Sequence, residues 1–255
     1  MHELSRKNMT RALILAAGRG SRMKQLTEDK PKCFTVFSGK PLIDWQLNAL
    51  RKAGIGDIGL VRGYLAESFH HELHYFDNHD WESSNMVRSL LCASRWMALG
   101  SVVSYSDIVY SANAVRQLLA GNGDIAITYD PHWLDLWKLR FEEVLSDAET
   151  FVINGESRVT EIGQTPQSIH DIQGQYMGLS YFSPTGWQRC LDILDRYDAR
   201  FIDRLDMTKL LQLLIAADVP VQAVPVTNRW YEIDSEADLS AYESHLADSV
   251  DIFAR

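Results

Sequence analysis

The stretch Leu13-Ile-Leu-Ala-Ala-Gly-Arg-Gly-Ser-Arg-Met23, followed closely by Lys30-Pro-Lys-Cys33, predicts the fold. Its apolar run ends abruptly at Gly18-Arg19-Gly20-Ser21-Arg22, as expected for a buried strand that leads into a loop at the edge of a sheet. The two glycines permit positive φ and let backbone N–H groups approach an anion. Within fourteen residues the chain carries five cations: Arg19, Arg22, Lys24, Lys30 and Lys32. The stretch therefore predicts a polyphosphate-binding loop.

The spacing of this loop excludes two common phosphate-binding motifs. The dinucleotide fingerprint Gly-x-Gly-x-x-Gly requires a third glycine where this chain has Met23. The P-loop pattern Gly-x-x-x-x-Gly-Lys-Ser/Thr does not occur anywhere in the sequence.

The composition predicts one ordinary globular domain spanning residues 1–255, with 46% hydrophobic and 23% charged residues. A net charge of −9 argues against nucleic acid or an anionic membrane as a partner. No apolar stretch approaches the ~20 residues of a membrane span, and the polar start is unlike a signal peptide. We therefore expect a cytoplasmic protein. The three cysteines, Cys33, Cys92 and Cys190, are too far apart to indicate a disulfide framework or a Cys-x-x-Cys metal site.

Strands and helices alternate in the first half of the chain. Strands are expected over 11–17, 57–61, 101–106 and 124–129, with helices that begin at Pro41, at Ser83 or Ser84, and at Ser111. A further helix and a strand are expected between Tyr64 and the helix at Ser83 or Ser84. This alternation predicts an α/β fold with a doubly wound, mostly parallel, Rossmann-like sheet. Ligands in such sheets lie at the carboxyl ends of the strands. The Gly18 loop, Gly63 and Asp107 all follow strands, so we expect them to share one crevice.

The second half has a different order of expected strands and helices, and it predicts a small β-containing substrate lobe near 130–182. Asn154-Gly155 suits a type I′ turn in a hairpin over 149–161. A strand is expected over 175–182, helices from Pro184 and over 207–217, short strands over 219–226 and 230–233, and a closing helix from Ser235. The single domain thus divides into a nucleotide-binding half, 11–128, and an acceptor-binding half, 129–255.

The opening motif, Leu15-Ala-Ala-Gly-x-Gly-Ser-Arg-Met23 with Lys30-Pro-Lys32, resembles the signature of nucleotidyltransferases that make nucleotide-diphospho-sugars and CDP-alcohols. The resemblance implies catalytic roles for Arg22 and Lys32, with Lys32 reaching the phosphates and stabilising charge in the transition state. From the residue alone, Lys32 is equally compatible with a solvated lysine. The resemblance also implies a run of nucleotide-binding residues: Leu15, Ala16, Ala17, Gly18, Arg19, Gly20 and Ser21.

Two carboxylates, Asp107 and Asp234, each follow an expected strand. Taken singly, each is best explained as a helix N-cap or turn residue. The resemblance implies instead that the two together bind Mg²⁺, which takes one or two protein carboxylates and completes its shell with phosphate oxygens and water.

The segment Ser83-Ser-Asn-Met-Val-Arg-Ser89 is similar to segments of cytidylyltransferases that act on phosphocholine, aminoalkylphosphonates and phosphorylated amino-acid derivatives. That similarity implies that Ser84, Asn85 and Ser89, with the Gly63-Tyr64 turn, hold the cytosine of CTP. Without it, a helix cap beside a solvated arginine is nearly as good an explanation.

The acceptor is predicted less directly. Trp133, Trp137 and Arg140 are spaced for one helical face, which suits either an aromatic wall with a cation or, as the residues alone favour, core packing. Together with Asp147-Ala-Glu-Thr150 and Gln175-Tyr-Met-Gly178, they resemble capsule-pathway cytidylyltransferases that use phosphorylated glutamine. This resemblance implies an acceptor site made of Trp133, Trp137, Arg140, Gln175, Tyr176, Gly178 and Glu232. Phosphocholine, phosphonate and sugar-phosphate acceptors remain open.

The sequence thus predicts a Mg²⁺-dependent cytidylyltransferase that transfers CMP from CTP to a small phosphorylated or phosphonate compound and releases pyrophosphate. The alternatives are a uridylyl- or thymidylyltransferase acting on a sugar-1-phosphate, and a non-catalytic nucleotide-sensing domain. Arg22, Lys32, Asp107 and Asp234 favour an enzyme, because a sensor need not keep all four. A homodimer is left open. No role is expected for Cys33, and His70, His71, His74 and His79 are interpreted as a solvated helix face.

Overall fold

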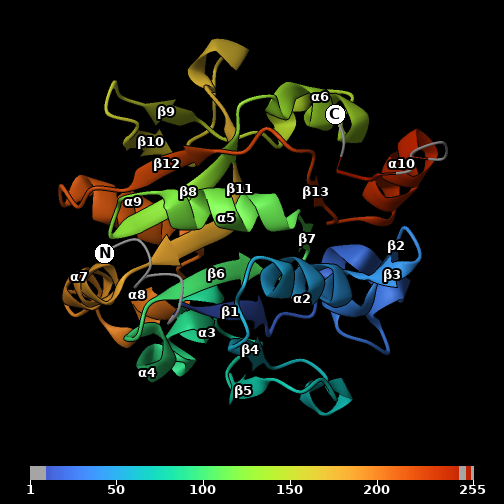
Figure 1. Cartoon of the computed structure of the whole chain (residues 1–255), viewed down its shortest axis with the longest axis horizontal. Coiled ribbons are helices and arrows are strands. Elements are labelled where there is room, and N and C mark those ends of the chain that lie inside the picture. Colours follow the sequence, from blue (N-terminus) through green and yellow to red (C-terminus); the bar gives the residue numbers. More distant parts are fainter. Residues whose placement is uncertain (1–9, 247–250, 254–255) are drawn as a thin grey trace.

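A computed structural model describes residues 10–246 and 251–253 of the chain. A mixed seven-stranded sheet forms its centre, in the order β12-β8-β11-β6-β1-β4-β5 (Figure 1). Every neighbouring pair is parallel except those made by β11, which runs antiparallel to both β6 and β8. In chain order the strands are β1 (Arg11–Ala16), β4 (Ile58–Arg62), β5 (His74–Asp77), β6 (Ser101–Tyr105), β8 (Ile125–Asp130), β11 (Gln175–Phe182) and β12 (Gln222–Pro225).

Helices cover both faces of the sheet and bury one apolar core on each face. The first core receives side chains from α2 (Leu42–Lys52), α5 (Ala112–Ala120), α6 (Trp133–Arg140) and α10 (Glu236–Leu246). The second receives them from α3 (Met86–Cys92), α4 (Ser94–Met97), α7 (Pro184–Leu194) and α9 (Met207–Ala216). Strand β1 shows why both cores form, because Ala12 and Ile14 face the first and Leu13 and Leu15 face the second. The doubly wound, mostly parallel α/β fold is confirmed.

Smaller elements surround this core. In the described residues they comprise the pairs β2 (Val36–Phe37) with β3 (Lys40–Pro41), β7 (Ile108–Val109) with β13 (Tyr231–Glu232) and β9 (Phe151–Ile153) with β10 (Val159–Ile162), the short helix α8 (Ala199–Asp203), and five 3₁₀ segments. The first 3₁₀ segment, Ser21–Thr27, lies within the cationic loop. The part of the chain described here has no helix that is long and apolar enough to cross a membrane.

Two expectations in the first half were wrong. The N-cap of α3 is Asn85, whose side chain accepts a hydrogen bond from the backbone N–H of Met86, and not Ser83 or Ser84. The segment before β5 contains a single 3₁₀ turn, Ala66–Ser68, in place of a helix. The four histidines therefore share no helix face: His74 begins β5, and the others lie in the turns around it.

Two details of the second half also differ from expectation. The β9–β10 hairpin forms, but its turn is wider than a type I′ Asn-Gly turn, with Ser157 at a φ of 56°. The Asn154 side chain accepts from the N–H groups of Glu156 and Arg158, and these bonds favour the wider loop. Strand β11 lies in the middle of the main sheet and not in the substrate lobe. The lobe therefore consists of α6, the β9–β10 hairpin and the short segments around them.

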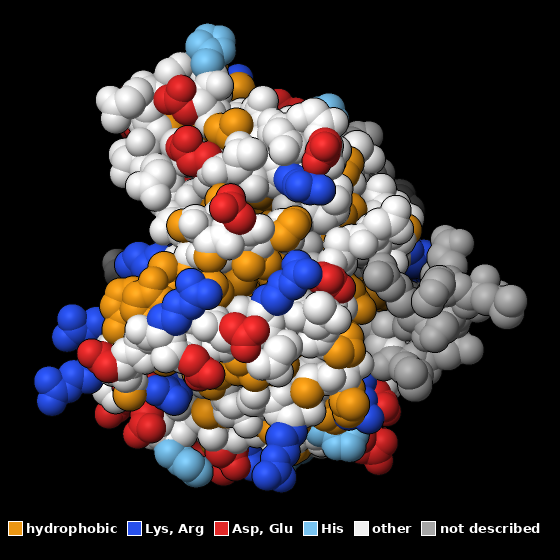
Figure 2. Space-filling model, turned by 90° about the vertical axis from the view of Figure 1, so that its left-hand side faces the viewer, with side chains coloured by type: hydrophobic (Ala, Val, Ile, Leu, Met, Phe, Trp, Pro, Cys, Tyr) orange, Lys and Arg blue, Asp and Glu red, His pale blue; other side chains and the backbone are white. Residues whose placement is uncertain are grey.

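The molecule is indented between this lobe and the body. On the face drawn in Figure 2, hydrophobic side chains are exposed in the indentation and Lys and Arg side chains lie beside them. Strands β6, β1 and β4 are adjacent and parallel, so the segments that follow them meet at one edge of the sheet.

Candidate active site

A cavity of about 300 Å³ lies at the carboxyl end of β1. The loop after this strand forms one wall and the N-terminus of α3 forms another. It is lined by Leu15, Ala17, Gly18, Gly20, Ser21, Arg22, Lys32, Ser84, Asn85, Met86, Ser89, Ser106 and Asp107. We call this space the donor cavity. The segments after β1 and β6 meet here, as the sequence predicts.

Two glycines allow the backbone to pack closely around the donor cavity. Gly20 has a φ of +68°, and a Cβ there would lie 2.7 Å from the Lys32 side chain. A Cβ on Gly63 would lie 2.6 Å from Trp81 and 2.8 Å from the carbonyl oxygen of Ala17. Gly18, in contrast, has no positive φ and nothing near its Cβ position, so the expectation of a left-handed backbone is correct for Gly20 alone.

The Gly63-Tyr64 turn holds the loop instead of lining the cavity. The backbone N–H of Tyr64 donates to Ala17, and its hydroxyl lies within hydrogen-bond distance of the carbonyl oxygens of Thr27 and Glu28. Arg19 lies over the Tyr64 ring, 5.6 Å from its centroid. Ala16 faces the first apolar core. These predicted nucleotide-binding residues therefore lie behind or beside the cavity.

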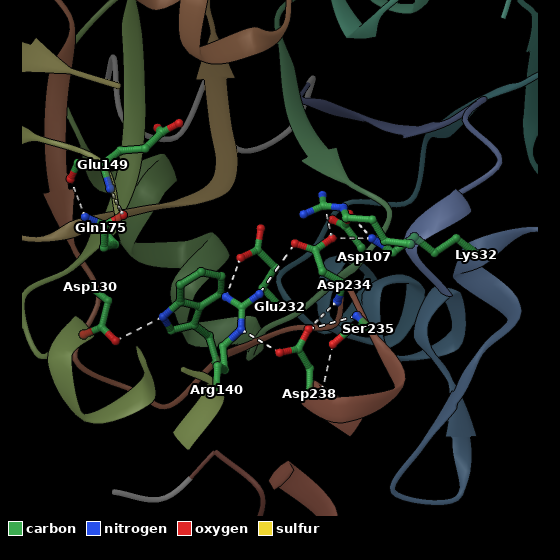
Figure 3. Close-up of polar contacts among 12 residues, drawn as sticks. Lys32, Asp107, Asp130, Arg140, Glu149, Gln175, Glu232, Asp234, Ser235 and Asp238 are labelled. Atoms are coloured by element: carbon green, nitrogen blue, oxygen red, sulfur yellow. Dashed lines mark hydrogen bonds and ion pairs between the residues drawn. The ribbon is translucent and has the colours of Figure 1, made fainter. Parts of the chain in front are cut away.

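At the inner end of the donor cavity, one lysine joins the two predicted metal ligands (Figure 3). The Lys32 ammonium is 2.7 Å from Asp107 Oδ2 and 2.5 Å from Asp234 Oδ1, and its side chain is 8% exposed. Arg22, with a side chain 69% exposed, approaches the same Asp234 oxygen at 3.1 Å. All four residues that favour an enzyme thus lie in one cluster. We call Arg22, Lys32, Asp107 and Asp234 the junction cluster.

The charges of the junction cluster stabilise one another. Burial opposes an ammonium charge, but the adjacent Asp107 and Asp234 carboxylates outweigh it and raise the pKa of Lys32. Burial likewise opposes the Asp234 carboxylate, yet Lys32, Arg22 and Arg140 hold its pKa below the usual value. Lys32 and Asp234 therefore stabilise each other in their charged forms.

The junction cluster fits a divalent cation that is shared with a substrate. Asp107 Oδ1 is buried and receives no hydrogen bond, so one carboxylate oxygen beside Asp234 is unpaired. In the described residues, no group of three or more His, Cys, Asp or Glu side chains could hold a metal by itself. Two carboxylates without further protein ligands are typical of Mg²⁺ that also binds substrate phosphates.

A second cavity, of about 200 Å³, adjoins the junction cluster on the side of the lobe. Arg22 lines both cavities. The second is lined by Arg22, Tyr105, Trp137, Asp147, Glu149, Thr150, Phe151, Ile162, Gln175, Tyr176, Thr208, Glu232 and Asp234. We call it the acceptor cavity. Its side chains combine aromatic rings with carboxylates.

The carboxylates of the acceptor cavity have raised pKa values. Burial raises the pKa of Glu149, as do the neighbouring charges of Asp206 and Asp147. Burial also raises the pKa of Asp147 and brings that of Glu232 to about 7, although Arg140 partly offsets the effect at both residues. A cationic ligand in this cavity would relieve the repulsion between these groups.

The predicted acceptor residues lie in different positions around this cavity. Trp137, Tyr176 and Glu232 line it directly. Gln175 lines it as well, but its side-chain amide bonds the backbone N–H and C=O of Glu149. Trp133 packs edge-on against Trp137 in the core, with ring centroids 5.9 Å apart. Gly178 has a φ of +74° and accommodates the Tyr105 ring, which would lie 2.7 Å from a Cβ.

Arg140 lies outside both sets of cavity-lining residues. Its side chain is 1% exposed, and its guanidinium is surrounded by Glu232, Asp234 and Asp238. In the structure this arginine binds carboxylates of the protein, whereas the sequence resemblance implies that it binds the acceptor.

Several lining residues were not predicted as site residues. Met86 and Ser106 each neighbour a predicted residue of the donor cavity, so wider segments around Asn85 and Asp107 would have included them. Asp147, Glu149 and Thr150 belong to a segment that carries the resemblance, but no local pattern gave them a role. Tyr105, Phe151, Ile162 and Thr208 look like ordinary strand or helix residues, and only the tertiary fold brings them together.

Known proteins share the sequence and the fold of this chain. Residues 12–162 match the MobA-like NTP transferase domain. The chain is 36% identical over 247 residues to CTP:phosphoglutamine cytidylyltransferase from Campylobacter jejuni, covering 89% of this chain and 97% of that one. It is 27% identical over 252 residues to 2-aminoethylphosphonate cytidylyltransferase from Lancefieldella rimae, covering 94% of each chain.

Solved structures share the fold at lower sequence identity. CTP:phosphocholine cytidylyltransferase from Streptococcus pneumoniae superposes with a TM-score of 0.70 at 22% identity, covering 93% of this chain and 99% of that one. A putative glucose-1-phosphate thymidylyltransferase from Bacillus anthracis gives a TM-score of 0.73 at 15% identity, covering 95% and 96%. These two likenesses concern the fold. Together with the match over residues 12–162 and the identity to a full-length relative, they show that this chain is an enzyme of the MobA-like NTP transferase family.

Proposed function

We propose that this enzyme is a Mg²⁺-dependent cytidylyltransferase. It transfers CMP from CTP to a small acceptor that carries a phosphate or phosphonate group at one end and an amine at the other. The observation that carries the proposal is that the donor and acceptor cavities meet at the junction cluster, so that two substrates can approach each other across it.

The chemistry is a displacement at the α-phosphorus of CTP. A phosphate or phosphonate oxygen of the acceptor forms a bond to this phosphorus, and the bond from the phosphorus to the oxygen of the β-phosphate breaks. Pyrophosphate leaves with the bonding electron pair. No covalent enzyme intermediate is required, because such transfers depend mainly on positioning and electrostatics.

The chain's own residues supply both the positioning and the electrostatic stabilisation. The cationic loop holds the triphosphate through Gly20 and Ser21, and Ser84, Asn85 and Ser89 hold the cytosine. Arg22 and Lys32 stabilise the charge that develops on the phosphoryl oxygens and on the leaving group. Asp107 and Asp234 hold Mg²⁺, which neutralises phosphate charge when it is bound.

The acceptor class follows from the second cavity. Asp147, Glu149 and Glu232 present carboxylates beside the rings of Trp137 and Tyr176, a combination that favours an ammonium group. The relatives named above act on phosphoglutamine and 2-aminoethylphosphonate, which share a phosphoryl or phosphonyl group and an amine. Trp137, Tyr176 and Gln175 form and support the acceptor wall, with Trp133 and Gly178 behind it.

The test is pyrophosphate release with Mg²⁺, using each NTP in turn against phosphorylated glutamine, 2-aminoethylphosphonate, phosphocholine, glycerol phosphate and sugar-1-phosphates. We expect release with CTP and an amine-bearing acceptor, and none when EDTA replaces Mg²⁺. Release only with UTP or dTTP and a sugar phosphate would contradict the proposal, and so would activity that EDTA leaves unchanged.

A further inference from the structure

Arg140 is the most completely enclosed cation near the site, and it binds three carboxylates at once (Figure 3). Its Nη1 is 2.7 Å from Glu232 Oε2, its Nε is 3.0 Å from Asp238 Oδ1, and its Nη2 is 3.5 Å from Asp234 Oδ2. These acids come from β13, from the residues after it and from α10. Because guanidinium offers five N–H donors in a fixed plane, one arginine can bind three groups, whereas a lysine ammonium is a point charge on a flexible stem.

These contacts fix Asp234 from the side that faces away from the substrates. Its Oδ1 faces Lys32 and Arg22, whereas its Oδ2 faces Arg140. The Asp234 backbone N–H donates to Asp238 Oδ2 at 3.0 Å, and the N–H of Ser235 donates to the same oxygen at 2.9 Å. Arg140 and Asp238 thus hold both the side chain and the backbone of this residue.

The same guanidinium also supports the acceptor wall. It binds the Glu232 carboxylate and lies 5.2 Å from the centroid of the Trp137 ring, and both residues line the acceptor cavity. Arg140 lines neither of the two cavities that the described residues form here. Its contacts are therefore with residues that face the substrates, and not with the substrates themselves.

We propose that Arg140, held by Asp238, is a positioning residue that orients the Asp234 carboxylate toward the metal and the Glu232 carboxylate toward the acceptor. The inference rests on the proposed function, because it assumes that Asp234 is a metal ligand. Groups that orient metal ligands through hydrogen bonds typically change metal affinity or activity by about 10- to 100-fold when they are replaced.

The test measures binding as well as turnover. We would determine the dissociation constant of CTP by calorimetry, once with Mg²⁺ and once with EDTA. The value in EDTA divided by the value in Mg²⁺ measures the contribution of the metal, and we call it the ratio. The variants are Arg140→Lys, Arg140→Met and Asp238→Asn. Arg116→Lys serves as the control, because Arg116 lines neither cavity and its guanidinium donates to the backbone oxygen of Lys52.

We expect the ratio to fall by about tenfold or more in Arg140→Lys and Asp238→Asn, with the EDTA value unchanged and kcat reduced by about 10- to 100-fold. Arg116→Lys should match the wild type. The Lys and Asn variants keep the test informative if the Met variant fails to fold, because they retain a charge or a hydrogen-bonding group.

Three results would overturn the inference. The first is an unchanged ratio in folded Arg140→Lys and Asp238→Asn. The second is a higher ratio in Arg140→Met, which would mean that Arg140 acts on the metal only as a repelling charge. The third is a wild-type ratio of one, which would contradict the metal-dependent function itself and is recognised without any variant.

Discussion

The donor and acceptor cavities adjoin each other but are built in different ways. Except for Asp107 and Ser106, the donor cavity uses two short segments, 15–32 and 84–89, at the end of β1 and after β5. The acceptor cavity takes its lining from widely separated segments between Arg22 and Asp234. The first is a local motif presented by a strand, whereas the second exists only after the whole chain has folded.

Their chemistry is opposite as well. Small residues, glycine and cations line the donor cavity, as suits a polyanion held partly by backbone N–H groups. Carboxylates and aromatic rings line the acceptor cavity. We therefore expect the reaction to depend on the donor side and the junction cluster, and the choice of acceptor to depend on the lobe.

The largest effect expected from this comparison is at Lys32, which belongs to the shared junction. Lys32→Ala should lower kcat by about 10²- to 10³-fold with every acceptor, because it removes a preorganised charge from the reaction centre. Steady-state pyrophosphate release measures this, with Lys52→Ala at the exposed end of α2 as the control. Near-normal turnover in Lys32→Ala would contradict the assignment of the reaction centre.

A smaller and more selective effect is expected at Glu149, which lines the acceptor cavity alone. Glu149→Gln should lower kcat/KM for an amine-bearing acceptor by about 10- to 100-fold, the size of a lost charged hydrogen bond, while KM for CTP stays within about twofold. Glu156→Gln, on the β9–β10 turn, is the control. An equal loss with glycerol phosphate as acceptor would show that Glu149 does not recognise the amine.

Gly63→Ala should give the converse selectivity on the donor side. The added methyl group would meet Trp81 and the Ala17 carbonyl at under 3 Å, so the turn that holds the loop must shift at a cost of about 1–3 kcal/mol. We expect KM for CTP to rise about 5- to 10-fold, with KM for the acceptor unchanged. Gly155→Ala, with nothing near its Cβ position, is the matched control. A change in the acceptor KM alone would contradict the assignment of this turn to the donor side.

The smallest effect is expected at Trp133, which stands behind the acceptor wall. Trp133→Phe should lower thermal stability slightly and change the acceptor KM by less than about twofold, whereas Trp137→Phe should raise that KM about threefold or more because its ring faces the cavity. Melting curves and steady-state kinetics together measure both. Equal effects of the two substitutions on KM would place Trp133 in the acceptor site after all.

The sequence predicts the donor side well because short local sequence patterns determine that side. An apolar run, a glycine-rich turn and a Pro-Lys pair indicate a strand, a loop and a lysine, and the order of the parallel strands then brings Asp107 close. Asn85 in place of Ser83 or Ser84 at the cap is an error of one or two positions, since all three side chains can accept the same hydrogen bond.

The acceptor side is predicted less fully because its determinants are tertiary. The helical spacing of Trp133, Trp137 and Arg140 correctly gives a helix, but not which of its side chains faces a cavity. The contacts of Arg140 could not be predicted, because they depend on where Asp234 and Asp238 lie after folding. The antiparallel placement of β11 was likewise missed, because one strand's direction in a sheet leaves no periodic signal in its own residues.

The ammonium of Lys32 between Asp107 and Asp234 has a consequence for folding. Two carboxylates that converge without a cation would repel each other, and a cation between them relieves that repulsion. Here the polypeptide supplies its own counter-ion, so the energetics of folding are separated from those of turnover. We expect the melting temperature of the free enzyme to be the same in EDTA and in Mg²⁺, so that the proposed Mg²⁺ would act in turnover and not in folding.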